Sequence, residues 1–88
     1  MLEYHAAYYR ETDGWYIAKV LDFPGALSQG RTLKSAQRMI RDALRMLVEG
    51  LIEDGQPLPR PNPRATDKRA DHLETVPVSI RARCGMKP

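Results

Sequence analysis

Cysteine is nearly absent from this sequence. A single residue, Cys84, occurs among 88, so the chain cannot close a disulfide on itself. No apolar run is long enough to cross a bilayer, and the first residues lack the layout of a secretion signal. These absences exclude a disulfide scaffold and an integral membrane protein, and they predict a soluble protein of the reducing cytoplasm.

Residues that carry catalysis or bind metals are also few and badly spaced. None of the three serines lies in a nucleophile elbow, and the glycines of PGALSQG lack the lysine of a phosphate-binding loop. The two histidines and Cys84 match no zinc-binding spacing. Acids such as Asp42, Glu49 and Glu74 form no set converging on two metal ions. We therefore predict no catalytic residue, no metal site and no cofactor, and rank a vestigial nuclease last.

The excess of positive charge is small and uneven. The net charge is +3, well below that of a dedicated nucleic-acid-binding domain. Much of the excess lies late in the sequence, at Arg60, Arg64, Lys68, Arg69, Arg81, Arg83 and Lys87. An accessory domain that binds RNA or DNA through these residues and exposed tyrosines therefore stays open as an alternative function.

The first third of the sequence is typical of a β-hairpin followed by a short strand. Residues 3–10 alternate around three tyrosines, and Asp13-Gly14 is a strong signal for a tight turn. Residues 15–21 are β-branched and aromatic, which favours a second strand, and residues 26–29 form a short third one. Because the two sides of a strand alternate, half of the aromatic side chains are expected in the core and half in an exposed patch.

Residues 32–54 have the spacing of one long helix. Thr32 is a good N-cap, and Gly55 is suited to the left-handed position after the last turn. The apolar residues recur at steps of three and four along Leu33, Ala36, Ile40, Ala43, Leu44, Leu47 and Leu51. Met39, Met46, Val48 and Ile52 widen the apolar surface beyond this stripe. Since a chain this short has a small core, they predict a homo-oligomer, either a dimer or a tetramer.

The remaining sequence predicts an extended connection and a last strand. Gln56 to Pro63 alternates prolines with other residues and excludes both helix and central strand. Residues 73–83 then alternate as a strand, which Pro77 places at a sheet edge or a bulge. We expect one domain over residues 1–84 and a frayed tail over residues 85–88.

One set of residues is interpreted as scaffold rather than as a site. Pro24 and Gly25 turn the chain out of the second strand, Gly30 bends the third, and the glycines permit positive φ at these turns. The full set of predicted structural motif residues is Asp22, Pro24, Gly25, Gly30, Thr32, Gly55 and Pro59.

In this order the residues resemble the HicB-like antitoxin family. The matching positions are Asp22, Pro24, Gly25, Gly30, Thr32, Leu33, Ala36, Ala43, Leu44, Gly55, Pro59 and Pro61. The resemblance implies an α+β domain with a degenerate RNase H-like, two-layer fold. It implies an antiparallel meander of the first three strands, a helix across one face, and a last strand parallel to the first.

The resemblance also implies a function and a partner. HicB proteins neutralise HicA, a small basic toxin that cleaves mRNA, in a type II toxin–antitoxin system. Many also carry a DNA-binding segment, and we expect no such domain in this chain. We expect the exposed sheet surface to bind the toxin, with candidate contacts at Tyr9, Tyr16, Arg31, Lys34 and Arg38.

Overall fold

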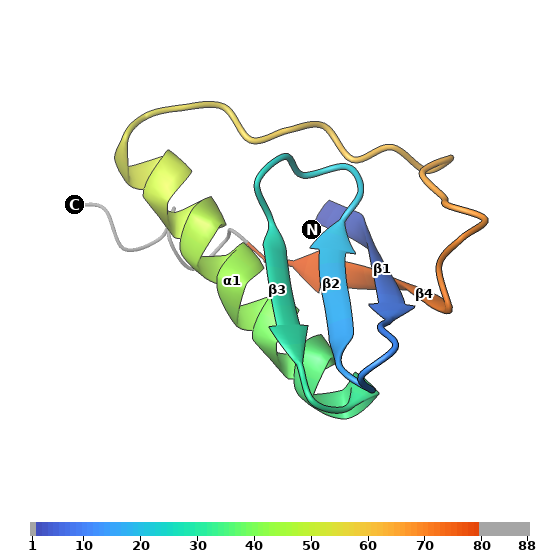
Figure 1. Ribbon diagram of the computed structural model, residues 1–88. Coiled ribbons are helices and arrows are strands. Elements are labelled where there is room, and N and C mark those ends of the chain that lie inside the picture. The colour runs from blue at the N-terminus through green and yellow to red at the C-terminus, as the bar shows by residue number, and fades with distance from the viewer. Residues whose placement is uncertain (1, 80–88) are drawn as a thin grey trace.

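The computed structural model describes residues 2–79, which form one sheet with one helix across one of its faces (Figure 1). The elements are β1 (Leu2–Arg10), β2 (Tyr16–Val20), β3 (Leu27–Gly30), α1 (Leu33–Glu53) and β4 (His72–Val78). Within this range the strand order is β3-β2-β1-β4, and each neighbouring pair is antiparallel. The predicted α+β class, the meander of three strands and the single long helix are therefore confirmed.

The β1–β2 hairpin turns at the predicted dipeptide. Gly14 has a φ of 91°, and the Trp15 amide donates to Asp13 Oδ1 at 3.0 Å. The Glu11 amide donates to the Trp15 carbonyl at 2.7 Å, which closes the loop. Because a side chain at this positive φ would be strained, glycine fixes where the chain reverses.

The core lies between α1 and the side of the sheet that faces it. Alternation along β1 directs Tyr4, Ala6 and Tyr8 to this side, and all three are fully buried. The rings of Tyr4 and Phe23 meet edge to face, with their centroids 5.0 Å apart. The remaining members of this buried cluster are Ala18, Val20, Ala26, Ala36, Ile40, Leu44, Val48 and Val76.

Both ends of α1 form as predicted, whereas Gly30 acts for a different reason. Thr32 Oγ1 accepts a hydrogen bond from the Ser35 amide at 3.0 Å, and Gly55 has a φ of 70° after the last turn. Gly30, unlike Gly25, does not adopt a positive φ. A Cβ atom at Gly30 would lie 2.5 Å from the backbone nitrogen of Ala36. The close approach of the first helical turn to β3 therefore requires glycine here.

The predicted parallel arrangement of the last strand is wrong. β4 pairs antiparallel with β1, from Leu2 opposite Val78 to Tyr8 opposite His72. The prediction assumed a crossover that returns to the start of β1. Instead, the connecting segment (residues 54–71) runs past the start of β1 and reaches the last residues of that strand. There the Asp71 amide donates to the Tyr8 carbonyl at 2.8 Å. β4 therefore begins beside the end of β1 and runs back along it.

Other predictions need smaller corrections or lie outside the described residues. Val48 was predicted to widen an exposed apolar surface, but it is 3% exposed and belongs to the core. Leu47 was predicted for the buried stripe, but it is 37% exposed. The predicted strand over residues 73–83 extends beyond the described range, as do Cys84 and the tail. The likeness to an RNase H fold stays a prediction.

Candidate partner-binding surface

The face of the sheet opposite α1 carries a different set of side chains. Register and alternation direct His5, Ala7 and Tyr9 of β1 to this face, beside Ile17 and Lys19 of β2. Leu27 of β3 and Leu73 of β4 lie on the same face, at opposite sides of β1. In place of a helix, the connecting segment contacts this face. This face of the sheet, which we call the far face, is therefore only partly covered.

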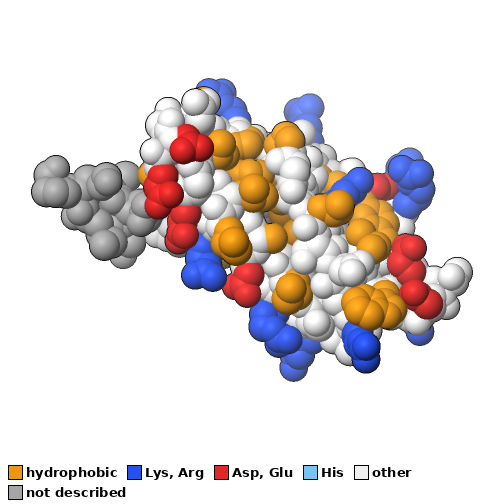
Figure 2. Space-filling view, turned by 60° about the vertical axis from the view of Figure 1, so that its left-hand side comes forward, with side chains coloured by type: hydrophobic (Ala, Val, Ile, Leu, Met, Phe, Trp, Pro, Cys, Tyr) orange, Lys and Arg blue, Asp and Glu red, His pale blue; other side chains and the backbone are white. Residues whose placement is uncertain are grey.

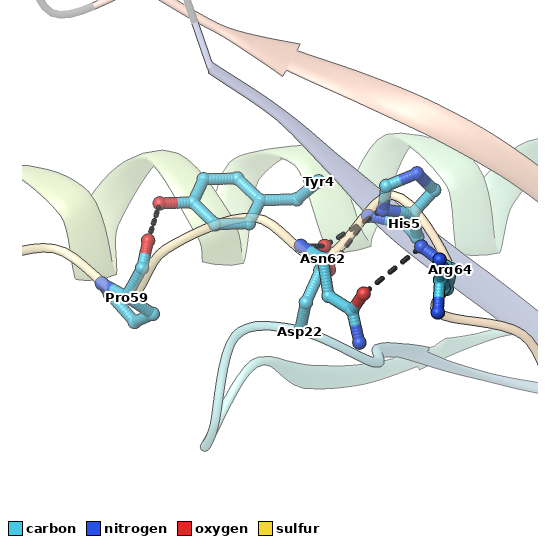
Figure 3. Close-up of polar contacts among 6 residues, drawn as sticks. All are labelled: Tyr4, His5, Asp22, Pro59, Asn62 and Arg64. Atoms are coloured by element: carbon cyan, nitrogen blue, oxygen red, sulfur yellow. Dashed lines mark hydrogen bonds and ion pairs between the residues drawn. The ribbon is translucent and has the colours of Figure 1, made fainter.

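Asp22 holds the connecting segment to the sheet (Figure 3). Its Oδ1 accepts the His5 amide at 2.8 Å, and its Oδ2 lies 2.8 Å from His5 Nδ1 and accepts the Asn62 amide at 2.9 Å. Only 3% of its side chain is exposed. Burial raises the pKa of this carboxyl, but the hydrogen bonds from His5 and Asn62 outweigh it and lower the pKa overall. Asp22 therefore joins β1, the β2–β3 turn and the connecting segment.

Further hydrogen bonds along the connecting segment fix its path. The Tyr4 hydroxyl donates to the Pro59 carbonyl at 2.7 Å on the core side, as Figure 3 shows. Beyond Asn62, the Tyr9 hydroxyl donates to Asp67 Oδ2 at 2.7 Å on the far face. Asp71 then accepts the Arg10 amide at 2.6 Å. The segment thus passes from the α1 side, around the end of the sheet, to the far face.

A groove remains between this segment and the outer strands. It has a volume of about 370 Å³ and is lined by Tyr9, Glu11, Ile17, Lys19, Leu27, Asp67 and Arg69. Leu27 lines this groove, and 62% of its side chain is exposed to solvent. A large apolar side chain that is exposed in this way does not stabilise the free chain. The groove therefore has apolar walls with charged groups of both signs around them, as at many partner-binding surfaces.

Tyr9 is held in the groove by two contacts of its side chain. Lys19 Nζ lies 5.6 Å from the centroid of its ring, within the range of a cation–π contact. Partial burial and the hydrogen bond to Asp67 raise the pKa of the Tyr9 hydroxyl to about 12. The same hydrogen bond lowers the pKa of Asp67. At neutral pH, the groove therefore presents a neutral phenol beside a carboxylate.

The five predicted contact residues do not form one site. Tyr9 lies in the groove, but Tyr16 is on the other face and packs against the core. The Arg31 guanidinium lies 5.4 Å from the centroid of the Trp15 ring. Lys34 and Arg38 are exposed on α1. Since Tyr9 and Tyr16 lie on opposite faces, the described residues offer no continuous aromatic surface for bases, and nucleic-acid binding stays a prediction.

A polar cluster around Glu74 was not predicted from the sequence. This carboxylate accepts from the Tyr8 hydroxyl at 2.5 Å and Gln37 Nε2 at 3.3 Å, and it lies 3.5 Å from Arg41 Nη2. Burial and the contact with Glu74 raise the pKa of Tyr8. The alternation of β4 indicated that Glu74 shares a side with Val76, but not which helix residues it meets. The cluster links β1, β4 and α1, so we interpret it as structural.

Neither a metal site nor a membrane span is found in the described part of the chain. Over residues 2–79, no three histidine, cysteine or acidic side chains gather closely enough to hold a metal ion. Over the same range, no helix has the length and apolar character that crossing a membrane requires.

Comparison with known proteins gives consistent matches. A family model for the HicB-like antitoxin of bacterial toxin–antitoxin systems matches residues 4–80. Antitoxin HicB of Escherichia coli K12 is 32% identical over 71 residues, which are 81% of this chain and 49% of that protein. UPF0150 protein Ta0767 of Thermoplasma acidophilum is 33% identical over 61 residues, which are 69% of this chain and 88% of that protein.

Solved structures match the fold. The N-terminal domain of Burkholderia pseudomallei antitoxin HicB superposes with a TM-score of 0.75 at 27% identity, covering 89% of this chain and 99% of that domain. A longer structure of the same antitoxin gives 0.79 at 28% identity, covering 91% of this chain and 64% of the other. This chain spans about half the length of the E. coli relative. On the family match over residues 4–80, the chain belongs to the HicB-like antitoxin family.

Proposed function

We propose that this chain neutralises a HicA-type toxin, a small basic protein that cleaves mRNA, by binding it through the groove on the far face. Membership in the antitoxin family supports the class of partner. The observation that carries the choice of surface is Leu27, which is 62% exposed on a sheet face that α1 does not cover. The chain acts by masking rather than by catalysis.

The chemistry of the groove suits a basic protein partner. Ile17 and Leu27 supply apolar area, whose burial contributes about 25 cal/mol per Å² before the costs of association. Glu11 and Asp67 supply carboxylates at the margin, where a lysine or arginine of the toxin can lay its apolar stem along the groove. Lys19 and Arg69 lie beside them, so charge fixes the orientation of the partner more than its affinity.

Masking follows from the competition between protein and RNA for the same toxin. A ribonuclease binds its RNA through basic residues, since phosphate contacts dominate such binding. An antitoxin that places carboxylates against those residues excludes the RNA backbone without any chemical step. The predicted contacts Arg31, Lys34 and Arg38 lie on or beside α1 and are not needed in this arrangement.

The test is co-expression with the protein encoded by the neighbouring gene, followed by titration calorimetry of the purified pair. We expect a stable complex, and we expect Leu27→Glu to weaken it at least about 30-fold by placing a charge in the apolar contact. Leu73→Glu is the matched control, because Leu73 is 43% exposed on the same face but across β1 from the groove. Lack of binding by the unmodified chain contradicts the function, and equal effects of both variants contradict the surface.

A further inference from the structure

The outer side of α1 carries residues that the folding of one chain does not explain. Met39 is 44% exposed and Met46 is 68% exposed, although neither contributes to the core. Gly50 lies inside the helix, where glycine is about 1 kcal/mol less favourable than alanine. A Cβ atom at Gly50 would have no neighbouring atom within 4 Å. In a single chain, therefore, nothing requires this glycine.

The spacing of these residues places them in one row. Met39, Ala43, Met46 and Gly50 follow one another at steps of four, three and four, which is the spacing of a seam between two helices. The row alternates a long, adaptable side chain with a small one. When two such rows pack antiparallel, Met39 lies opposite Gly50 of the second copy, and Met46 lies opposite Ala43.

The charged residues beside this row match the same residues of a second helix that runs in the opposite direction. Arg38, Asp42, Arg45 and Glu49 flank it on one side and alternate in sign. When two copies of the helix pack antiparallel, the same side of the row in each copy lies in the contact. Arg38 then lies beside Glu49 of the second copy, and Asp42 lies beside Arg45 of the second copy. In a parallel pair facing through the same row, this flank would instead meet the opposite flank of the second copy, so these four charges would not face one another. The charge order therefore selects one arrangement, which has the two-fold symmetry of most homodimers.

We propose that α1 is the contact between two copies of this chain, packed antiparallel about a two-fold axis. Figure 1 shows α1 beside β3, the edge strand of the sheet, so no further strand flanks the helix there. Figure 2, which brings that side forward, shows hydrophobic side chains with lysine and arginine around them. Of the residues first expected at an oligomer surface, Met39 and Met46 belong to this contact. Val48 is in the core, and Ile52 packs against it.

Charge reversal with rescue tests the proposal by sedimentation equilibrium of the full chain. Since one helix pair is smaller than a standard interface, we expect a dimer with a Kd on the order of 10 µM. We expect Arg38→Glu and Glu49→Arg each to weaken it about tenfold or more, because each reversal creates two like-charge contacts. The combined variant restores the opposite pairs and the dimer. Arg60→Glu in the connecting segment is the matched control and leaves the affinity unchanged.

Gly50→Leu supplies an independent test, because two readouts move in opposite directions. A leucine at Gly50 favours the helix of one chain, so the dilute variant is at least as resistant to urea as the unmodified chain. The same leucine fills the space that Met39 of the second copy occupies, so the dimer is lost. Single chains at 500 µM overturn the proposal, as does a dimer that is insensitive to Gly50→Leu or that the combined charge variant fails to restore.

Discussion

The two faces of the sheet are covered by different means. On one face, α1 buries a continuous cluster of apolar side chains around Ile40 and Leu44, each at most 1% exposed. On the other, the connecting segment is fixed by hydrogen bonds at separate points, notably Asp22 and Tyr9. Apolar packing excludes water over the whole of its area, whereas separate hydrogen bonds leave gaps between them. The far-face groove lies beside the segment that is held by such separate hydrogen bonds.

The closest approach on the α1 side gives the largest expected effect. Gly30→Ala places a Cβ atom 2.5 Å from the Ala36 backbone nitrogen, and backbone cannot move aside as a side chain can. We expect a loss of about 3 kcal/mol or more in the free energy of unfolding, measured by urea denaturation. A loss under about 1 kcal/mol would show that α1 does not pack this closely on β3.

Replacing one isoleucine on each face with alanine compares how much the two faces contribute to the free energy of unfolding. Ile40→Ala on the core face removes a fully buried side chain, and we expect it to lower the free energy of unfolding by about 3 kcal/mol. Ile17→Ala on the far face removes a half-buried one, so about 1 kcal/mol is expected. The pair is compared by urea denaturation at one protein concentration. Equal losses would contradict the distinction between the faces.

Asp22 tests the hydrogen bonds of the far face. Asp22→Ala leaves the His5 and Asn62 amides without their acceptor, and we expect about 2 kcal/mol less stability. Because folding lowers the pKa of Asp22, its contribution is complete above the unfolded value near 4 and is lost as the pH falls through the folded value. Asp22→Asn should therefore flatten the dependence of stability on pH between about pH 5 and pH 2. An unchanged pH dependence would contradict this role.

Replacing Gly50 has the smallest expected effect on the free energy of unfolding, and this effect is an increase rather than a loss. At about 1 µM, where we expect separate chains, Gly50→Ala should raise the free energy of unfolding by about 1 kcal/mol. Gly55→Ala is the control, since a φ of 70° strains any side chain and should lower stability. Thermal denaturation of both variants measures these two changes in stability. Loss of stability in Gly50→Ala would show that the single chain requires this glycine.

Local signals predicted most of the fold, because their causes lie within a few residues. The Asp13-Gly14 turn, the Thr32 cap and the Gly55 position each depend on one or two neighbours, and all three are confirmed. The direction of β4 depends instead on contacts such as Tyr4 with Pro59, 55 residues apart. Nothing in the local pattern of residues 56–71 indicates which of these contacts form.

The candidate site was predicted only in part, for the same reason. Tyr9 was chosen as an exposed aromatic residue, and it does line the groove. Tyr16 was chosen by the same criterion but falls on the opposite face, because the hairpin register places Tyr9 opposite Ile17. Asp67 and Arg69 belong to a segment without periodicity, and only its path in three dimensions brings them to Tyr9.

We propose that the far-face groove, rather than the outer side of α1, binds the toxin. The most direct measurement is the toxin affinity of Leu27→Glu and of Arg38→Glu, compared with the unmodified chain by titration calorimetry. We predict that Leu27→Glu weakens binding at least about 30-fold, whereas Arg38→Glu changes it less than about threefold. The reverse order, with Arg38→Glu abolishing toxin binding and Leu27→Glu leaving it intact, would contradict the account.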